Sequence, residues 1–373
     1  MTERATNLIN IFACGDVMTG RGIDCILPHP SNPILYESHI KDARRYLEFA
    51  KEVNGPIPKP VNFSYIWGDA IAELSRLSPD LRLINLETSV TQSESYWQGK
   101  GINYRMNPEN IGCLVAAKID FCSLANNHVL DWGYSGLAET LATLKKVHIA
   151  TAGAGHNLEE AETPAVLKIE GQQRAIVLSL GTRGSGIPLI WAASDRKPGV
   201  NLKDLSEQTV LDIKTQIEPI KQQKDIVIVS IHWGGNWGYE ITSSQRKFAR
   251  QLIDLAGVDL IVGHSSHHVK GIEVYQGKLI LYGCGDFIND YEGIGGYELF
   301  RDDLSLMYFL SIDSLTGKLI YLQMLPTQIK RFQVKRASTT DAIWLKDILN
   351  REGKNLGTQA NLNKDNTLTL KWN

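Results

Sequence analysis

The chain has 373 residues and a formal net charge of -2 at pH 7, from 39 Lys and Arg residues against 41 Asp and Glu residues. This balance argues against a protein that binds nucleic acid through bulk electrostatics. Its 43% hydrophobic content and its 8 Trp and 13 Tyr residues exclude a disordered chain. The length predicts either two domains or one large α/β domain.

The amino terminus and the cysteines indicate the cellular compartment. Residues 1–10 contain no apolar stretch of signal-peptide length, and the apolar runs elsewhere are far shorter than the ~18 residues that a membrane helix needs. The 5 cysteines are widely spaced and form no C-x-x-C pair, which favours neither a disulfide framework nor a zinc ribbon. We therefore expect a cytoplasmic protein without a membrane anchor.

Strands and helices are predicted to alternate through most of the chain. Apolar runs of strand length occur at 8–14, 81–84, 119–124, 225–231 and 258–262. Longer patterns between them predict helices at 64–77, 137–146, 204–221 and 243–256, the last with Ser243 as its N-cap. Each of the apolar runs is followed by polar side chains, and in open α/β sheets the functional sites form at the carboxyl ends of strands.

The carboxyl-terminal half is richer in predicted strands, at 271–283, 304–312 and 319–325. Together with the α/β half, these strands predict two sheets packed face to face with helices outside. Two stretches are expected to be peripheral. Residues 28–61 are proline-rich around a predicted helix at 36–53 and are interpreted as an insertion after the first strand, and residues 330–373 are interpreted as a polar, loosely docked tail.

The polar residues at the strand ends are carboxylates, an amide and imidazoles. They are Asp16, Glu87, Asn127, His128, His232, His264 and His267. These groups are suited to Mn, Fe, Zn or Mg. A single such residue is more often a cap or a turn residue, but their presence at five strand ends favours a metal centre. Two ions about 3.5–4 Å apart, bridged by a carboxylate, can activate water for an in-line phosphoryl displacement.

Several short segments carry a more specific signal. They are Gly-Asp-Val-Met at 15–18, Asn-Leu-Glu at 85–87, Asn-Asn-His-Val-Leu-Asp-Trp-Gly at 126–133, His-Trp-Gly at 232–234, Gly-His-Ser-Ser-His at 263–267 and a closing segment at 281–287. In this order they resemble the CapA-type proteins, a branch of the calcineurin-like metallophosphoesterases named for capsule and poly-γ-glutamate biosynthesis. The resemblance covers roughly residues 9–325.

The resemblance implies an α/β fold, a two-sheet α-β-β-α sandwich of the metallophosphoesterase type. It implies one domain at 1–329 that contains the insertion, followed by an extension at 330–373. It also implies a dinuclear site for divalent ions, with Mn, Fe, Zn, Mg or Ca as candidates.

The resemblance further assigns a role to each motif residue. Glu87 would bridge the two ions in place of the Asp of ordinary metallophosphoesterases. One ion would be held by Asp16 and His267, and the other by Asn127, His232 and His264. His128 would act as the general acid or as a donor to the transition-state oxyanion. Asp131 would either orient that imidazole or cap the helix that begins near Gly133.

Two positions depart from the family pattern. Met18 stands where ordinary members have a histidine, and a thioether is a poor ligand for hard divalent ions, so one ion would lose a protein ligand. The Gly-His-x-x-His spacing leaves His268 as an alternative to His267.

Other residues suggest how a substrate is bound. Arg21 and Arg105 lie in loops near the motifs and are predicted to bind it, because guanidinium groups pair with phosphate or carboxylate. The expected partner is therefore a small molecule or peptide that carries phosphate or carboxylate, with no nucleic acid involved.

The leading hypothesis is a metal-dependent hydrolase, a phosphoesterase that uses a metal-bound hydroxide. A component of capsule or poly-γ-glutamate biosynthesis and a metal-dependent amino-acid or peptide epimerase remain alternatives.

Overall fold

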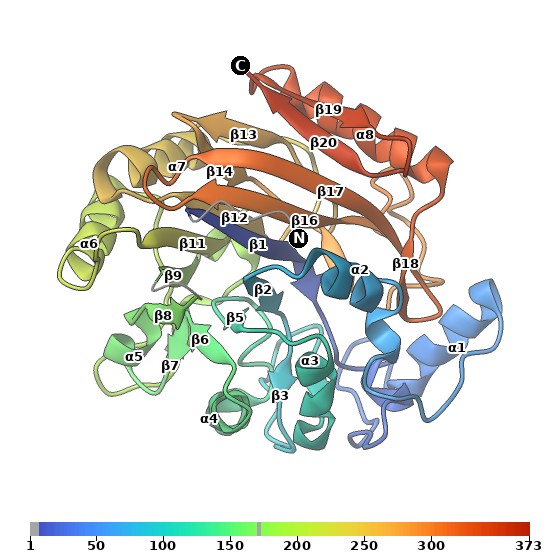
Figure 1. Cartoon of the computed structure of the whole chain (residues 1–373). Coiled ribbons are helices and arrows are strands. Elements are labelled where there is room, and N and C mark those ends of the chain that lie inside the picture. The colour runs from blue at the N-terminus through green and yellow to red at the C-terminus, as the bar shows by residue number, and fades with distance from the viewer. Residues whose placement is uncertain (1–6, 170–172) are drawn as a thin grey trace.

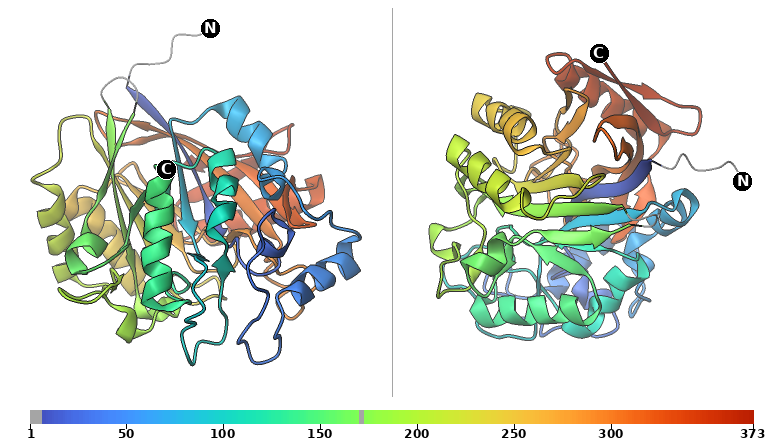
Figure 2. Two further views of the ribbon diagram at one scale, coloured as in Figure 1. Left: turned by 90° about the horizontal axis from the view of Figure 1, so that it is seen from below. Right: turned by 60° about the vertical axis from the view of Figure 1, so that its left-hand side comes forward.

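The computed structural model of the chain describes residues 7–169 and 173–373. Two β-sheets pack face to face, and helices cover their outer faces (Figures 1 and 2). This is the α-β-β-α sandwich that the sequence predicts.

The larger sheet has ten strands and includes both the first strand and the last strand of the described chain. Its path is β19 (Thr358–Leu362), β20 (Leu368–Trp372), β17 (Leu319–Lys330), β16 (Leu304–Asp313), β1 (Leu8–Val17), β2 (Leu81–Leu86), β5 (Phe121–Ser123) and β6 (Ala150–Ala152), with β15 (Asp286–Ile288) paired to β1 and β18 (Gln333–Arg336) paired to β17. Strands β1, β2, β5 and β6 run parallel, so their carboxyl ends meet at one edge of the sheet.

The smaller sheet has six strands, in the order β13 (Ile272–Tyr275), β14 (Lys278–Leu281), β12 (Leu260–His264), β11 (Ile226–His232), β9 (Arg174–Gly181) and β8 (Ala165–Lys168). Strands β9, β11 and β12 are parallel and place His232 opposite His264. Two short pairs complete the strands: β3 (Ser89–Val90) with β4 (Arg105–Met106), and β7 (Ala154–Gly155) with β10 (Gly199–Val200).

Apolar side chains from both sheets form the core between them, among them Ile11, Leu83, Val177, Ile228, Val262 and Leu306. The outer face of the larger sheet packs against α1 (Arg44–Asn54), α2 (Ala70–Leu77), α3 (Gly112–Ala116) and α4 (Gly133–Lys146). The outer face of the smaller sheet packs against α6 (Glu207–Ile217) and α7 (Ser243–Ala256). The helix α5 (Leu158–Glu162) lies beside β7, and α8 (Thr339–Gly353) lies beside β19 (Figure 1).

The helix α7 has the predicted limits, but its N-cap is Thr242 and not Ser243. The hydroxyl of Thr242 accepts a hydrogen bond from the backbone N–H of Gln245, and the Gln245 side chain accepts one from the backbone N–H of Thr242. The sequence offers a hydroxyl residue at both positions, and this reciprocal pair selects the earlier one.

The two stretches expected to be peripheral have different outcomes. In the insertion, the helix is shorter than predicted and begins at Arg44. The tail is not loosely docked: β20 pairs with β17, and Leu345 of α8 and Leu368 of β20 are buried in the core between the sheets. That prediction was wrong because the average polarity of the tail hides a strand alternation in 368–372, which buries Leu368 and Leu370 on one face.

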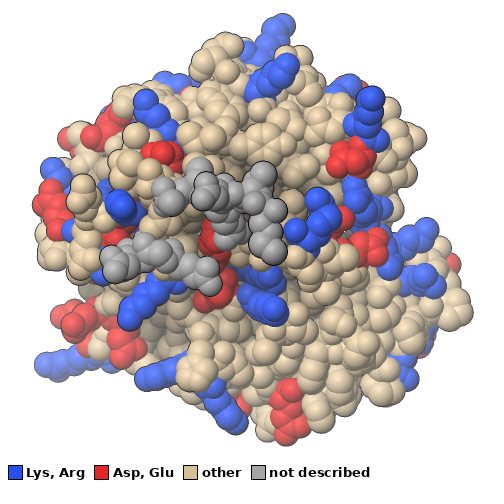
Figure 3. Space-filling model, in the orientation of Figure 1, with Lys and Arg blue, Asp and Glu red and all other residues tan. Residues whose placement is uncertain are grey.

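All five cysteines are free and buried. Basic and acidic side chains are interspersed over the face seen in Figure 3, in keeping with the balanced composition. Among the described residues, no helix is both long enough and apolar enough to cross a membrane.

Candidate metal centre

Two Gly-Asp segments lie against one another at the centre of the larger sheet. Strands β1 and β15 run parallel with Asp16 opposite Asp286, and the backbone N–H of Asp16 donates to the carbonyl of Gly285 over 2.8 Å. A Cβ atom on Gly15 would lie only 1.9 Å from that carbonyl oxygen, so only glycine permits this approach. The pairing brings a second buried carboxylate beside Asp16.

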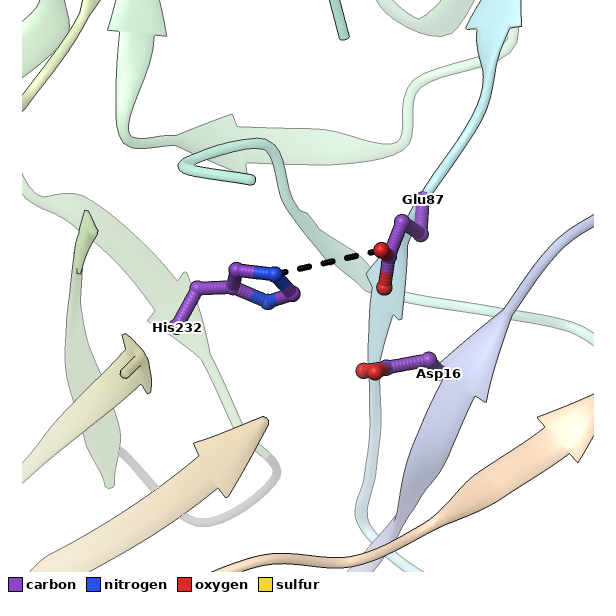
Figure 4. Close-up of side chains that lie close together, drawn as sticks. All are labelled: Asp16, Glu87 and His232. Carbon is purple, nitrogen blue, oxygen red and sulfur yellow. Dashed lines mark ion pairs between the residues drawn. The ribbon is translucent and has the colours of Figure 1, made fainter. Parts of the chain in front are cut away.

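Three side chains at strand ends come together in the interior (Figure 4). Asp16, Glu87 and His232 each offer one ligand atom, and these atoms lie within 4.8 Å of one another. Nε2 of His232 is 3.8 Å from Oε1 of Glu87. Asp16 and Glu87 come from the carboxyl ends of the parallel strands β1 and β2, and His232 ends β11 of the other sheet, so both sheets contribute to the cluster.

Polar groups around this cluster approach it closely. Nδ1 of His264 is 3.0 Å from Oδ1 of Asp16, yet it is buried without a hydrogen-bond partner. The side-chain oxygen of Asn127 is 3.2 Å from Nε2 of His232. An imidazole nitrogen 3.0 Å from a carboxylate oxygen, but without hydrogen-bond geometry toward it, is an arrangement that a bound cation would satisfy. The residues present therefore fit a divalent metal ion.

The electrostatics of the cluster agree with this fit. Burial, together with the neighbouring charge of Asp16, raises the pKa of Glu87. Burial also acts to raise the pKa of Asp16, but the imidazoles of His264 and His232 outweigh it and lower that pKa. Burial lowers the pKa of His232 to about 3, so this imidazole is neutral at physiological pH. Neutral imidazole beside two crowded carboxylates is a donor set that attracts cations.

His128 lies at the border of the cluster and is held by Asp131. Its Nδ1 is 2.6 Å from Oδ2 of Asp131, and its Nε2 is 3.8 Å from Oε1 of Glu87. The sequence leaves open whether Asp131 orients His128 or caps α4. The N-cap residue of α4 is Trp132, and no side chain forms a capping hydrogen bond with this helix. Asp131 therefore does not cap α4, and its carboxylate contacts the imidazole of His128. Asn126 fixes the loop, because its side-chain oxygen accepts from the backbone N–H of His128.

Lys100 is a neighbour of this pair that the sequence does not reveal. Its Nζ is 3.0 Å from Oδ1 of Asp131 and 3.2 Å from Nδ1 of His128. Burial first, and the charge of Lys100 in addition, lower the pKa of His128 to about 4, although Asp131 acts in the opposite direction. A lone lysine in a loop gives no sequence signal for such a position.

The two candidate histidines after β12 have different surroundings. Nδ1 of His267 is 2.9 Å from Asp286, and its Nε2 is 2.8 Å from the side-chain amide of Asn236. His268 packs against the rings of Trp237 and Phe300, and its Nε2 has no partner. Both rings lie near Trp237, but His267 is paired with a carboxylate, whereas the hydrogen-bond partner of His268 is the backbone carbonyl of Val269.

Asp286 and Asn236 lie close to the predicted ligand His267, although neither is among the metal ligands or catalytic residues predicted from the sequence. Asp286 is preceded by glycine, as Asp16 is, and that repeated Gly-Asp pattern is the signal that could have identified it. Asn236 lies in the glycine-rich stretch after β11 but is not adjacent to the end of that strand, so no comparable signal marks it.

The two arginines predicted to bind substrate are buried and held by protein groups. The guanidinium of Arg21 pairs with Asp290 and Glu37. That of Arg105 donates to the carbonyls of Ser93 and Asn32 and stacks on a tryptophan ring. Contact of either arginine with a substrate stays a prediction, and it would require these pairs to open.

Met18 is fully buried near the end of β1, and its sulfur lies 3.6 Å from the hydroxyl of Tyr291. The hydroxyl can donate to the thioether, which is a weak acceptor. Met18 is thus in contact with Tyr291, and its equivalence to a ligand histidine stays a prediction.

Comparison with known proteins places this geometry in a family. The profile described as "Bacterial capsule synthesis protein PGA_cap" matches residues 10–291, which include every predicted metal ligand. The chain belongs to this family. Within it, the chain is 44% identical over 366 residues to a probable polyglutamine synthesis accessory protein of Mycobacterium tuberculosis, covering 98% of this chain and 96% of that protein.

More distant similarities are also found. The PGA biosynthesis protein CapA of Bacillus subtilis is 33% identical over 228 residues, which are 61% of this chain and 56% of that protein. A solved structure described as a novel phosphatase from Mycoplasma pneumoniae aligns with a TM-score of 0.47 and 14% identity, covering 86% of this chain and 93% of that one.

Proposed function

We propose that this PGA_cap-family chain is a divalent-metal-dependent hydrolase of the phosphoesterase type. The observation that carries the proposal is the buried cluster of Asp16, Glu87 and His232, whose ligand atoms lie within 4.8 Å of one another. Two buried carboxylates repel one another when no cation is present. A bound cation offsets this repulsion and accepts the lone pair of the neutral imidazole.

We assign two metal positions that share Glu87. Asn127, His232 and His264 would hold one ion, and Asp16 and His267 would hold the other. The contact of His267 Nδ1 with Asp286 leaves Nε2 as the ring nitrogen for an ion, and the side-chain amide of Asn236, 2.8 Å from Nε2, would have to move aside. When bound, divalent ions supply Lewis acidity, which acidifies a water molecule and withdraws charge from phosphoryl oxygens.

His128 is assigned to proton transfer at its Nε2. Because Nδ1 donates to Asp131, the neutral ring leaves a lone pair on Nε2, which faces the cluster. A phosphoester bound there would bring negative charge next to the ring and favour protonation of Nε2. That proton could then go to the departing alkoxide, which is the usual task of a general acid.

Phosphate release tests this proposal. The purified full chain is supplied in turn with Mn, Mg, Zn, Fe and Ca, and phosphate is measured with a panel of phosphomonoesters and phosphodiesters. We expect metal-dependent release that the His128→Ala variant lacks. An absence of release with every ion and ester, in protein that contains stoichiometric metal, would refute the phosphoesterase assignment.

A second candidate is a role in polyglutamate synthesis that needs no catalysis. It is favoured by the relative described as a probable polyglutamine synthesis accessory protein, which matches 98% of the chain. The unchanged chain and its Glu87→Ala variant can be compared in a polymer-producing host that lacks its own family member. If the Glu87→Ala variant restores polymer as well as the unchanged chain does, the non-catalytic role is correct. If only the unchanged chain restores polymer, the intact site is required.

A further inference from the structure

A cavity of about 540 Å³ lies beside the candidate metal centre. His267 and Asn236 belong to its lining, so the cavity begins where one predicted metal ligand is accessible. Gly101 and Ile102, which directly follow Lys100, form another part of the lining. The insertion after β1 contributes Glu37–Ile40 and the helix α1. The cavity therefore joins the site to a segment to which the sequence assigns no function.

Aromatic and aliphatic side chains form much of the wall. The rings of Trp237 and Tyr297 stack in parallel with their centroids 3.8 Å apart. Tyr46 and Phe49 of α1 add two more rings, and Ile294 adds an aliphatic side chain. Tyr297 is 42% exposed, so this wall is open to a ligand. Flat apolar groups gain from contact with such rings through area burial and stacking.

The charges of the cavity lining do not favour an anion. The one arginine in the lining, Arg21, is paired with Glu37 and with Asp290. Asp302 also lines the cavity, and no Lys or Arg of the described chain forms an ion pair with it. Apart from three tyrosines, the remaining ionisable groups are two imidazoles: His39 is exposed, and His267 is paired with Asp286. The cavity thus presents carboxylates without a free permanent cation.

We propose that this cavity binds the organic group of the substrate and selects an aromatic or other flat apolar group that is neutral or positively charged. A polyanion such as a poly-γ-glutamate chain would place its carboxylates against Glu37 and Asp302 and is disfavoured there. Which bond of the substrate is broken rests on the proposed function. The preference of the cavity for neutral or cationic flat groups does not depend on that function.

Ligand binding to the full chain tests the proposal without any hydrolysis. Phenethylamine and 3-phenylpropionate have the same ring and similar length but opposite charge, and both lack phosphorus. Calorimetric titration at low salt should show phenethylamine binding about tenfold more tightly than 3-phenylpropionate. Added poly-γ-glutamate oligomers should not displace it. Equal affinities, tighter binding of the acid, displacement by the oligomers, or no binding of phenethylamine would each overturn the proposal.

Variants locate the binding in this cavity. Tyr297→Ala should weaken phenethylamine binding about fivefold or more, since it removes one ring of the stacked wall. The matched control is Tyr321→Ala, which removes a tyrosine of similar exposure (44%) on β17. Asp302→Asn should abolish the preference for the amine over the acid, whereas Asp347→Asn, on α8, should preserve it. If the control variants have the same effect as the cavity variants, the ligand binds elsewhere and the proposal fails.

The two proposals can fail separately. If phenethylamine binds as expected but no phosphoester is hydrolysed, the cavity assignment stands and the reaction class is wrong. If phosphoesters are hydrolysed but the Tyr297 and Asp302 variants bind both probes like the unchanged chain, the reaction class stands and the cavity assignment is wrong.

Discussion

Asp131 holds the imidazole of His128 from the side opposite to the metal cluster. The carboxylate oxygen and Nδ1 are 2.6 Å apart, while Nε2 is 3.8 Å from Glu87. One ring nitrogen is thus committed to a fixed partner and the other faces the candidate ligands. In the proposed function, this relationship separates two roles that lie close together in the chain: proton transfer by His128 and metal binding by its neighbour Asn127.

The first prediction concerns this pair. His128→Ala should abolish turnover, and Asp131→Asn should lower kcat by about 10–100-fold, since it removes the charge that orients the ring. Both variants should retain nearly the metal content of the unchanged chain, as measured by elemental analysis of the purified proteins. Loss of metal in either variant would show that the residue takes part in coordination instead.

The second prediction uses pH to separate His268 from His267. Burial lowers the pKa of His268 from 6.5 to about 4. The unfolded chain therefore takes up a proton at this residue below pH 6.5 that the folded chain does not take up until pH 4. Folded stability is lost as the pH falls through that window. His268→Phe should remove this loss, which is about 2 kcal/mol at pH 5.

Urea unfolding at pH 7 and pH 5 measures the effect for the unchanged chain and the variant. His268→Phe should also keep its metal, because the ring lies among Trp237, Tyr239 and Phe300. An equal loss of stability in both proteins, or a variant that fails to bind metal, would contradict this account of His268.

The third prediction concerns Met18. If it stands in the place of a ligand histidine, the ion held by Asp16 and His267 lacks one strong donor, and a mild chelator should remove it first. Met18→His should then tighten Mn binding, because neutral imidazole is a far better donor than a thioether. Titration of both metal-free proteins with Mn provides the measurement. Unchanged affinity together with a lowered Tm would mean that the imidazole is only a poorly satisfied buried group.

The sequence predicts much of this site because its ligands follow apolar strands. Asp16, His232 and His264 stand at or near the ends of such runs, and the parallel order of the strands then brings them to one edge. Asp286 has no such signal, since β15 has only three residues and its place depends on pairing with β1, about 270 residues away in the chain. Local periodicity does not reveal a contact of this range.

The arginines show a second limit. The sequence predicts that Arg21 binds substrate from a loop, but the protein partners that hold it, Glu37 and Asp290, lie 16 and 269 residues away. The buried position of the guanidinium arises only when the insertion and the segment after β15 fold against the loop after β1. The same long-range packing produces the cavity, which explains why the sequence does not indicate it.

The fourth prediction concerns the carboxyl-terminal segment. Leu368 is fully buried where β20 pairs with β17. Leu368→Ala should lower the free energy of unfolding by about 2–5 kcal/mol through lost burial and the resulting cavity. Exposed Leu315→Ala is the control and should change it by less than about 0.5 kcal/mol. Similar unfolding midpoints for the two variants in urea would show that the segment does not belong to the core.

We expect Glu87 to bind both metal ions of the proposed centre. A variant without the shared carboxylate should therefore lose both bound ions, whereas a variant without a ligand of a single ion should lose only that ion. The most direct measurement is the metal content per chain of Glu87→Ala beside that of the unchanged protein, after equal loading with Mn and equal dialysis. We expect close to two ions in the unchanged chain and close to none in the variant. A Glu87→Ala protein that keeps two ions would contradict this expectation.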